Sequence, residues 1–235
     1  MRPFARQPHK GIGPGWPRGS LSSRALPGRP LLRPLLFALL LVAAPFAQAP
    51  GAMATNPDEA AQFIDRLGKH AFATLQQANT PMAQREEAFG RILQQGFDLD
   101  LIGRFVLGKY WRQATPDQQA DYLDAFGRFV IKTYARRLGG FTGQTFSITG
   151  TSVTGDKGDV LVETQIERPS AAPILAAWRV RDSGGTLRII DVVVEGVSMA
   201  VTQRQEFASV TQRSGIEGLV QVLRAQTERL SASAS

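Results

Sequence analysis

The sequence predicts an α+β fold in which helices wrap an antiparallel sheet of four or five strands. Apolar residues recur at helical spacing up to residue 138 and again after residue 198. Between these regions, apolar and polar residues alternate with the period of two that strands show. Short turns rather than helices join the strand runs, which favours an antiparallel meander over parallel βαβ units. We expect about six or seven helices around this sheet.

Four helices are predicted before the sheet, each with a recognisable starting residue. Asn56-Pro-Asp-Glu59 supplies an N-cap, a proline at the first helical position and a capping-box acid. Pro81 opens the second helix, and Asp98 caps a short third one. Thr115-Pro-Asp-Gln118 is a second capping box, and its helix is expected to end at Gly139-Gly140.

Four runs are predicted as strands, with turn residues between them. Their approximate ranges are 144–154, 159–168, 174–182 and 186–195. In the second run every other residue from Val160 to Ile166 is apolar or threonine, so one face of the sheet is expected to be apolar. Gly196 then allows a sharp turn, a helix starts at Ser198, and a third capping box at Ser214 opens the last helix.

The N-terminal segment has the pattern of an export signal. Residues 1–54 hold seven basic side chains and no acidic one. Their apolar run, 35–44, is shorter than the about 20 residues that a membrane-spanning helix needs, and a small-x-small cleavage signal ends at Ala54. We therefore expect a signal peptide with a long basic leader over 1–54 and a single mature domain over 55–235. Cleavage after Ala49 is the alternative.

The expected mature chain carries little catalytic chemistry. Residues 55–235 hold 20 basic and 20 acidic side chains, which argues against a nucleic-acid partner. They hold one histidine, His70, and no cysteine, which argues against Cys-His nucleophiles, histidine-rich zinc sites and a Ser-His-Asp triad. Neither glycine pair has the strand-turn-helix context of a nucleotide site. No cofactor and no metal are expected.

Several segments agree with one known family in order and spacing. They are Phe97-Asp-Leu-Asp-Leu101, Leu107-Gly-Lys-Tyr-Trp111, Thr115-Pro-Asp-Gln118, the aromatic helix after it, and Asp191-Val-Val-Val-Glu-Gly-Val-Ser198. Over roughly residues 56–230 the chain resembles the MlaC family, also called the toluene-tolerance auxiliary family. The resemblance implies a strongly twisted antiparallel sheet wrapped by helices, related to NTF2-like cone folds, with a deep apolar cavity between sheet and helices.

The resemblance also implies a function. MlaC-like proteins are soluble periplasmic carriers of phospholipid between the two membranes of the Gram-negative envelope, and they maintain the lipid asymmetry of the outer membrane. The implied partners are phospholipid, an inner-membrane ABC-transporter complex with its MCE-type subunit, and an outer-membrane lipoprotein. A monomer without catalytic activity is expected.

Physical chemistry sets what such a carrier needs. A diacyl lipid exposes about 30 methylenes at about 0.8 kcal/mol each, so crossing water costs roughly 20 kcal/mol unless a protein covers both chains. The apolar stripes of the third and fourth helices and the inner face of the sheet are the candidates for that cover. The residues predicted to line the cavity and bind lipid are Leu101, Ile102, Phe105, Val106, Phe126, Phe129, Val130, Tyr134, Phe146, Ile148, Val162, Ile166, Trp178, Val180, Val193 and Val197.

Asp191 is the one carboxylate with a possible catalytic reading. By strand alternation it shares a face with Leu187, Ile189 and Val193. Burial on that face would favour the protonated form of its carboxyl group, which a general acid in a pocket needs. The favoured reading is structural, with Asp191 as the partner of an arginine such as Arg104 or of helix N–H groups.

Three other functions are kept as alternatives. The chain could carry a hopanoid or another rigid lipid, and Ala177-Trp178, where many relatives have a nearby tyrosine, leaves the lipid class open. It could be a small NTF2-like enzyme that uses Asp191 as its base. It could also be an envelope adaptor with a filled core, for which no ligand would co-purify.

Overall fold

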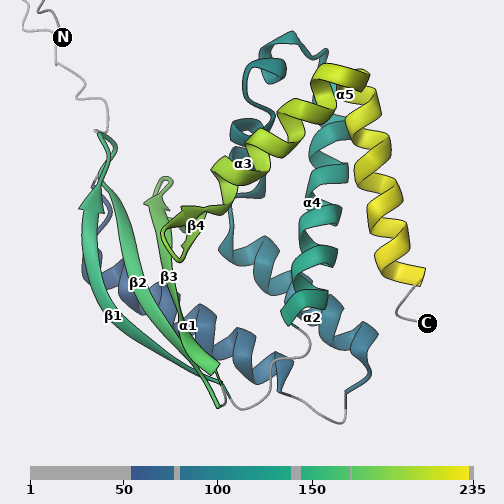
Figure 1. The fold of residues 1–235 in the computed structure, drawn as a ribbon. Helices are drawn as coiled ribbons and strands as arrows, with labels where there is room; N and C mark the ends of the chain where they lie inside the picture. Colours follow the sequence, from purple (N-terminus) through teal and green to yellow (C-terminus); the bar gives the residue numbers. More distant parts are fainter. Residues whose placement is uncertain (1–53, 77–79, 139–143, 170, 233–235) are drawn as a thin grey trace, which may run out of the picture. The chain divides into compact units, whose positions relative to one another are not determined.

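The computed structural model describes residues 54–76, 80–138, 144–169 and 171–232 (Figure 1). The predicted signal peptide lies outside these residues except for Ala54, and so does the predicted helix end at Gly139-Gly140. All described residues fall within one compact unit, residues 48–235. Within the part of the chain described, no helix is both long and apolar enough to cross a membrane.

The sheet is an antiparallel meander with the strand order β1-β2-β3-β4-β5. Its strands are β1 Thr145–Thr154, β2 Asp159–Arg168, β3 Ala171–Asp182, β4 Leu187–Val194 and β5 Val197–Ser198. The predicted α+β class and the antiparallel order are therefore confirmed. The fifth strand has only two residues because the chain turns at Glu195 and Gly196, both with positive φ, and then enters a helix.

A β-bulge in β4 changes which residues face the helices. Arg179 pairs with Asp191 but Val180 pairs with Ile189, so Ile190 is one residue more than the partner strand can match. The extra residue reverses the alternation along β4. As a result Ile189 and Val192, an odd and an even position, both pack against the same core.

The helices are α1 Pro57–Leu75, α2 Met82–Gly96, α3 Leu99–Leu107, α4 Pro116–Leu138 and α5 Met199–Ala232, with a 3₁₀ helix over Gly108–Gln113. Three of the predicted caps form, at Asn56, Asp98 and Thr115. The Asn56 side chain accepts from the N–H of Asp58 at 2.9 Å, and Asp98 accepts from that of Leu101 at 2.9 Å. Thr115 and Gln118 make a reciprocal capping box at 3.2 and 3.0 Å.

The two helices predicted to start at Ser198 and Ser214 are the two parts of α5. Gly215 interrupts it with φ 70° and ψ −177°, a conformation that favours glycine. The chain bends back at this point, so the second half of α5 lies beside α4 (Figure 1).

The apolar side chains gather mainly in two separate cores. The helical core joins α3, α4 and α5 and centres on Tyr122, Phe126, Phe207 and Leu223. The sheet core joins α1 to the inner face of β2, β3 and β4, and its fully buried members include Ile64, Val160, Val162, Val180 and Ile189. A third, smaller cluster of Phe89, Leu93 and Ala135 joins α2 to α4.

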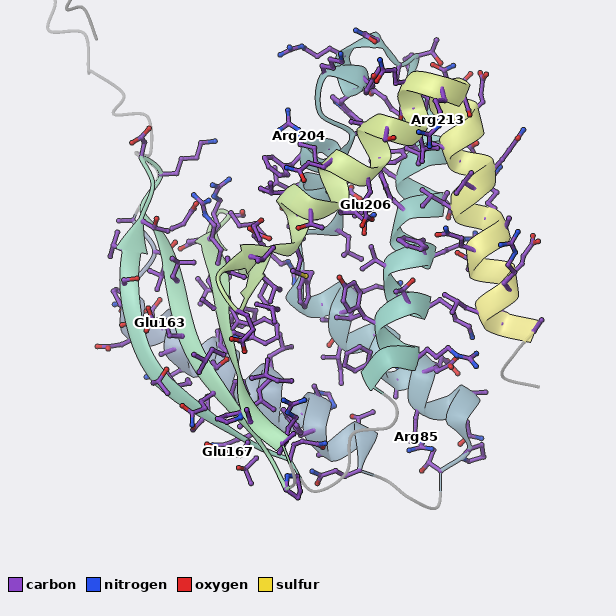
Figure 2. All side chains as sticks on the ribbon, viewed as in Figure 1. Arg85, Glu163, Glu167, Arg204, Glu206 and Arg213 are labelled. Atoms are coloured by element: carbon purple, nitrogen blue, oxygen red, sulfur yellow. The ribbon has the colours of Figure 1, made fainter. Side chains whose placement is uncertain are left out.

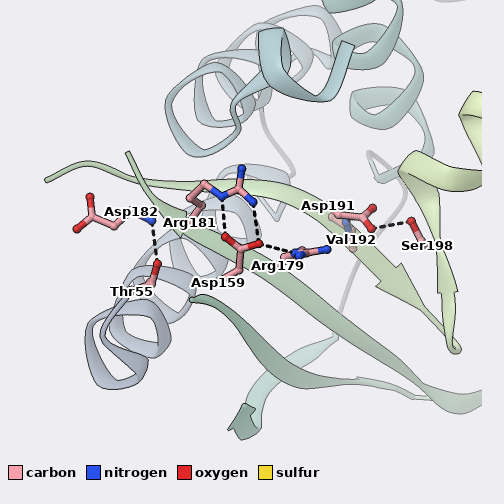
Figure 3. A network of polar contacts seen from close by, with 8 residues as sticks. All are labelled: Thr55, Asp159, Arg179, Arg181, Asp182, Asp191, Val192 and Ser198. Carbon is pink, nitrogen blue, oxygen red and sulfur yellow. Dashed lines mark hydrogen bonds and ion pairs between the residues drawn. The ribbon is translucent and has the colours of Figure 1, made fainter. Parts of the chain in front are cut away.

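An ion cluster closes the end of the sheet where the described chain begins (Figure 3). The fully buried carboxylate of Asp159 accepts from Arg181 Nε at 2.6 Å and from Arg179 Nε at 2.8 Å. Beside it, Thr55 donates its N–H to the Gly158 carbonyl and accepts from the N–H of Asp182. The cluster joins β2 to β3, and the two Thr55 bonds fix the first described residues to the ends of these strands.

Candidate functional site

An apolar cavity of about 350 Å³ lies between the two cores. Its wall takes residues from α1 to α5 and from β1 to β4. Of the described residues that line it, only Asp191 and Gln203 have a charged or amide side chain. Such a surface suits a hydrocarbon ligand and offers it few polar partners.

Eight of the predicted lipid-binding residues lie in this wall. They are Ile102, Val106, Phe126, Val130, Tyr134, Phe146, Ile166 and Trp178. They come from α3, α4 and three strands, so the fold brings together the helical stripe and the sheet face that the sequence suggested. Their contact with lipid stays a prediction.

Three of the other eight pack into the sheet core instead of facing the cavity. Val162 and Val180 have no exposed surface and pack in the sheet core with Ala60 and Ile64 of α1. Ile148 packs partly against the same core. The sequence predicted the apolar face correctly, but it did not show that α1 covers one end of that face and leaves the other end open.

Three more belong to helix faces that point elsewhere. Leu101 and Phe105 each precede a wall residue by one position, a turn of about 100° around the helix. Phe105 is 42% exposed. The Arg204 guanidinium lies over its ring, with Cζ 5.0 Å from the ring centroid. Phe129 packs into the helical core against Phe207, with ring centroids 6.3 Å apart.

The last two are displaced by the local geometry of β4 and β5. The bulge at Ile190 places Val192 and Val194 in the cavity wall, so Val193 is not in it. Val197, in the short strand β5, is 52% exposed.

The sequence reading missed the contribution of the first two helices. Wall residues from α1 and α2 include Leu67, Ala71, Phe72, Phe89, Ile92 and Leu93. Their apolar spacing was visible, but periodicity alone does not separate a face that covers a core from one that lines a cavity. One usable signal was Gly68, since a Cβ there would lie 2.9 Å from the Phe146 ring and prevent the close approach of α1 to β1.

The polar atoms in the strand wall are paired with one another. Trp178 donates its indole N–H to Thr164 Oγ1 at 2.9 Å, and Thr164 donates to the Ala176 carbonyl at 2.9 Å. The Phe97 ring meets Trp178 edge-on with centroids 6.4 Å apart. This part of the wall therefore presents aromatic surface to the cavity and no unpaired donor.

Asp191 acts as a cap for α5. It accepts from Ser198 Oγ at 2.6 Å (Figure 3). It also accepts from the Ala200 N–H at 3.1 Å and from the Val192 N–H at 2.8 Å. Ser198 Oγ in turn accepts from the N–H of Val201. One of these partners, the Ala200 N–H, is a helix N–H group, which agrees with the structural interpretation of Asp191.

Arg104, the other partner considered for Asp191, lies elsewhere. Its guanidinium is over the Trp111 ring, 5.2 Å from the centroid. Among the described residues no group of three or more His, Cys, Asp and Glu side chains could hold a metal ion.

Replacing Asp191 with asparagine should weaken the start of α5. Asparagine keeps one acceptor but loses the charge that favours a helix N-terminus, so we expect a loss of about 1 kcal/mol in the free energy of unfolding. Urea unfolding, monitored by circular dichroism, measures this free energy. A variant with unchanged stability would contradict the capping role, and Asp65→Asn, at an exposed position, is the matched control.

Comparison with known proteins now decides the family. The family model described as MlaC protein matches residues 65–225, which is more than half of the chain. The chain belongs to the MlaC family. The resemblance that the motifs suggested is thus confirmed, and the matched range holds the cavity residues of α2, α3 and α4.

Individual members of the MlaC family agree with this assignment. The chain is 26% identical over 126 residues to the intermembrane phospholipid transport system binding protein MlaC of Haemophilus influenzae, covering 52% of this chain and 59% of that protein. It is 28% identical over 131 residues to the toluene tolerance protein ttg2D of Pseudomonas putida, covering 55% and 60%. The match thus spans about three fifths of each relative.

A solved structure has the same fold. It is that of a phospholipid-binding protein from Ralstonia solanacearum in complex with a phospholipid, with a TM-score of 0.64 and 25% identity. The match covers 73% of this chain and 98% of that one. This MlaC-family chain therefore shares most of its described fold with a protein that binds phospholipid.

Proposed function

We propose that this protein is a phospholipid carrier that holds acyl chains in the cavity between its two cores. The observation that carries the proposal is the apolar wall of that cavity, built from both cores and nearly free of charged groups. The Ralstonia solanacearum protein of similar fold, which binds a phospholipid, supports it. The role is transport rather than catalysis, since both Asp191 oxygens serve the helix start.

The energetics of the site suit transfer between membranes. Burying hydrocarbon gains about 25 cal/mol per Å² in a bilayer and in an apolar cavity alike, so exchange between them is close to neutral. A cavity of about 350 Å³ is near the lower end of ligand pockets. The wall combines members of the helical core with members of the sheet core, so an acyl chain held there would contact both.

The proposed carrier works in the periplasm as the soluble binding component of an intermembrane phospholipid transport system. The name of the Haemophilus influenzae relative supports this placement. The export pattern of residues 1–54 agrees with it. The proposed partners are an inner-membrane ABC-transporter complex with an MCE-type subunit and an outer-membrane lipoprotein. Direction must come from those partners, because a carrier that binds lipid equally in both docked states shifts no equilibrium.

A transfer assay tests the proposal. Purified protein is mixed with donor vesicles that contain a fluorescent phospholipid and a quencher, and with acceptor vesicles that contain neither. We expect the protein to raise the rate of fluorescence recovery in proportion to its concentration. No rate increase, in protein whose circular dichroism shows it folded, would contradict the carrier role.

A further inference from the structure

A second, polar hollow adjoins the apolar cavity. This open groove of about 800 Å³ runs between the end of α2, the start of α3, the middle of α4 and the β3–β4 turn. Phe97 and Leu99 line both the groove and the apolar cavity, so the two spaces adjoin at these side chains. A ligand with its chains in the cavity can place its polar end in the groove.

The groove carries charges of both signs. Three carboxylates, Asp98, Asp100 and Asp124, and two guanidinium groups, Arg128 and Arg188, line it. Some of these charged groups already have partners within the protein. Arg128 pairs with Asp124 at 3.0 Å, and Asp98 caps α3. Arg188 donates one N–H to the Gln95 carbonyl, and a guanidinium has five such donors. Asp100 is exposed in the first turn of α3.

We propose that this groove receives a zwitterionic headgroup of the aminoalcohol phosphodiester class, such as phosphatidylethanolamine. The inference rests on the proposed carrier function and adds the class of lipid. The phosphodiester would lie at the guanidinium groups of Arg188 and Arg128, and the ammonium at the carboxylates of Asp100 and Asp124. The three carboxylates of the groove outnumber its two arginines. An anionic glycerol headgroup brings no cation to pair with these carboxylates, so the groove disfavours it.

A competition experiment tests this preference. Vesicles with equal amounts of phosphatidylethanolamine and phosphatidylglycerol, with identical acyl chains, are incubated with the protein, and native mass spectrometry gives the ratio of the two complexes. Because the groove is exposed to solvent, its charges contribute modestly, and we expect about a threefold excess of phosphatidylethanolamine. In the double variant Asp100→Asn with Asp124→Asn the ratio should fall to about one.

The control removes two charges elsewhere. Glu163 and Glu167 lie on the side of the sheet turned away from the helices (Figure 2). The double variant Glu163→Gln with Glu167→Gln should keep the wild-type ratio. Uptake of lipid without preference in all three proteins would overturn the headgroup inference alone. A wild type that takes up neither lipid would overturn the carrier function itself.

A labelling experiment locates the headgroup. The chain has no cysteine, so Thr186→Cys introduces a single thiol into the groove. Loading with phosphatidylethanolamine should slow its reaction with maleimide at least threefold, while Leu175→Cys, which is 52% exposed, should react at an unchanged rate. Gln203 is a polar residue of the apolar cavity wall and lies outside the groove lining. If lipid protected Gln203→Cys but not Thr186→Cys from maleimide, the assignment of the headgroup to the groove would be overturned.

Discussion

Replacing Ile166 with glutamate should leave the protein folded but without lipid. Ile166 lines the cavity from β2, and it is a member of none of the three packed clusters. A carboxylate there stays hydrated in the empty cavity, but acyl chains that enter would desolvate it, at a cost of several kcal/mol. We expect at least a tenfold fall in phospholipid per chain, measured by solvent extraction and mass spectrometry after purification without detergent.

The matched control for Ile166→Glu is Leu175→Glu. Leu175 is on the neighbouring strand, pairs with Gln165 and is 52% exposed, so its carboxylate would meet water with or without lipid. We expect wild-type lipid content for this variant. Equal lipid in both variants would mean that the ligand does not occupy the cavity.

The second large effect is expected at Asp159, where replacement with asparagine should destabilise the fold. The carboxylate is fully buried between Arg179 and Arg181, whose side chains are 35% and 20% exposed. Removing its charge leaves two partly buried cations without their counter-ion, and the loss of one partner of a buried pair costs about 3 kcal/mol. The midpoint of urea unfolding at pH 7 should fall by about 1.5 M if the slope is about 2 kcal/mol per M.

Asp124→Asn serves as the comparison for Asp159→Asn. It breaks an exposed pair between positions four apart on α4, which contributes about 0.3–0.5 kcal/mol. If Asp159→Asn lost no more stability than Asp124→Asn, the buried ion cluster would not be a main support of the sheet.

The contribution of Asp159 should also depend on pH. Burial alone would raise the pKa of this carboxyl group, but the hydrogen bonds and charges of Arg181 and Arg179 outweigh burial and hold the pKa below its ordinary value of 3.8. A group with a lowered pKa in the folded state stabilises the fold above its unfolded pKa, and that stabilisation is lost as the pH falls through its folded pKa. The stability difference between wild type and Asp159→Asn should therefore be constant from about pH 7 to pH 5 and shrink below about pH 4. A difference that grows on acidification would contradict this sign.

The features best predicted from the sequence are those fixed by neighbouring residues. The caps at Asn56, Asp98 and Thr115 depend on side chains two to three positions from the N–H groups they bind, so local sequence is sufficient. The alternation in β2 likewise placed Ile166 on the inner face of the sheet.

The features that could not be predicted depend on contacts distant in sequence. Nothing in the composition of β4 marks Ile190 as the extra residue of a bulge, and that residue alone puts Val192 rather than Val193 in the wall. Val162 and Ile166 have the same alternation in β2, yet α1 covers the first and the cavity meets the second. The separation of core from cavity is thus decided by helix packing against the sheet.

If the cavity holds a phospholipid, native mass spectrometry of the protein purified without detergent should detect it. We expect a main species heavier than the polypeptide by the mass of one phospholipid, which solvent extraction then identifies. A main species with the mass of the polypeptide alone, in protein that never met detergent, would contradict it and would favour an adaptor with no ligand.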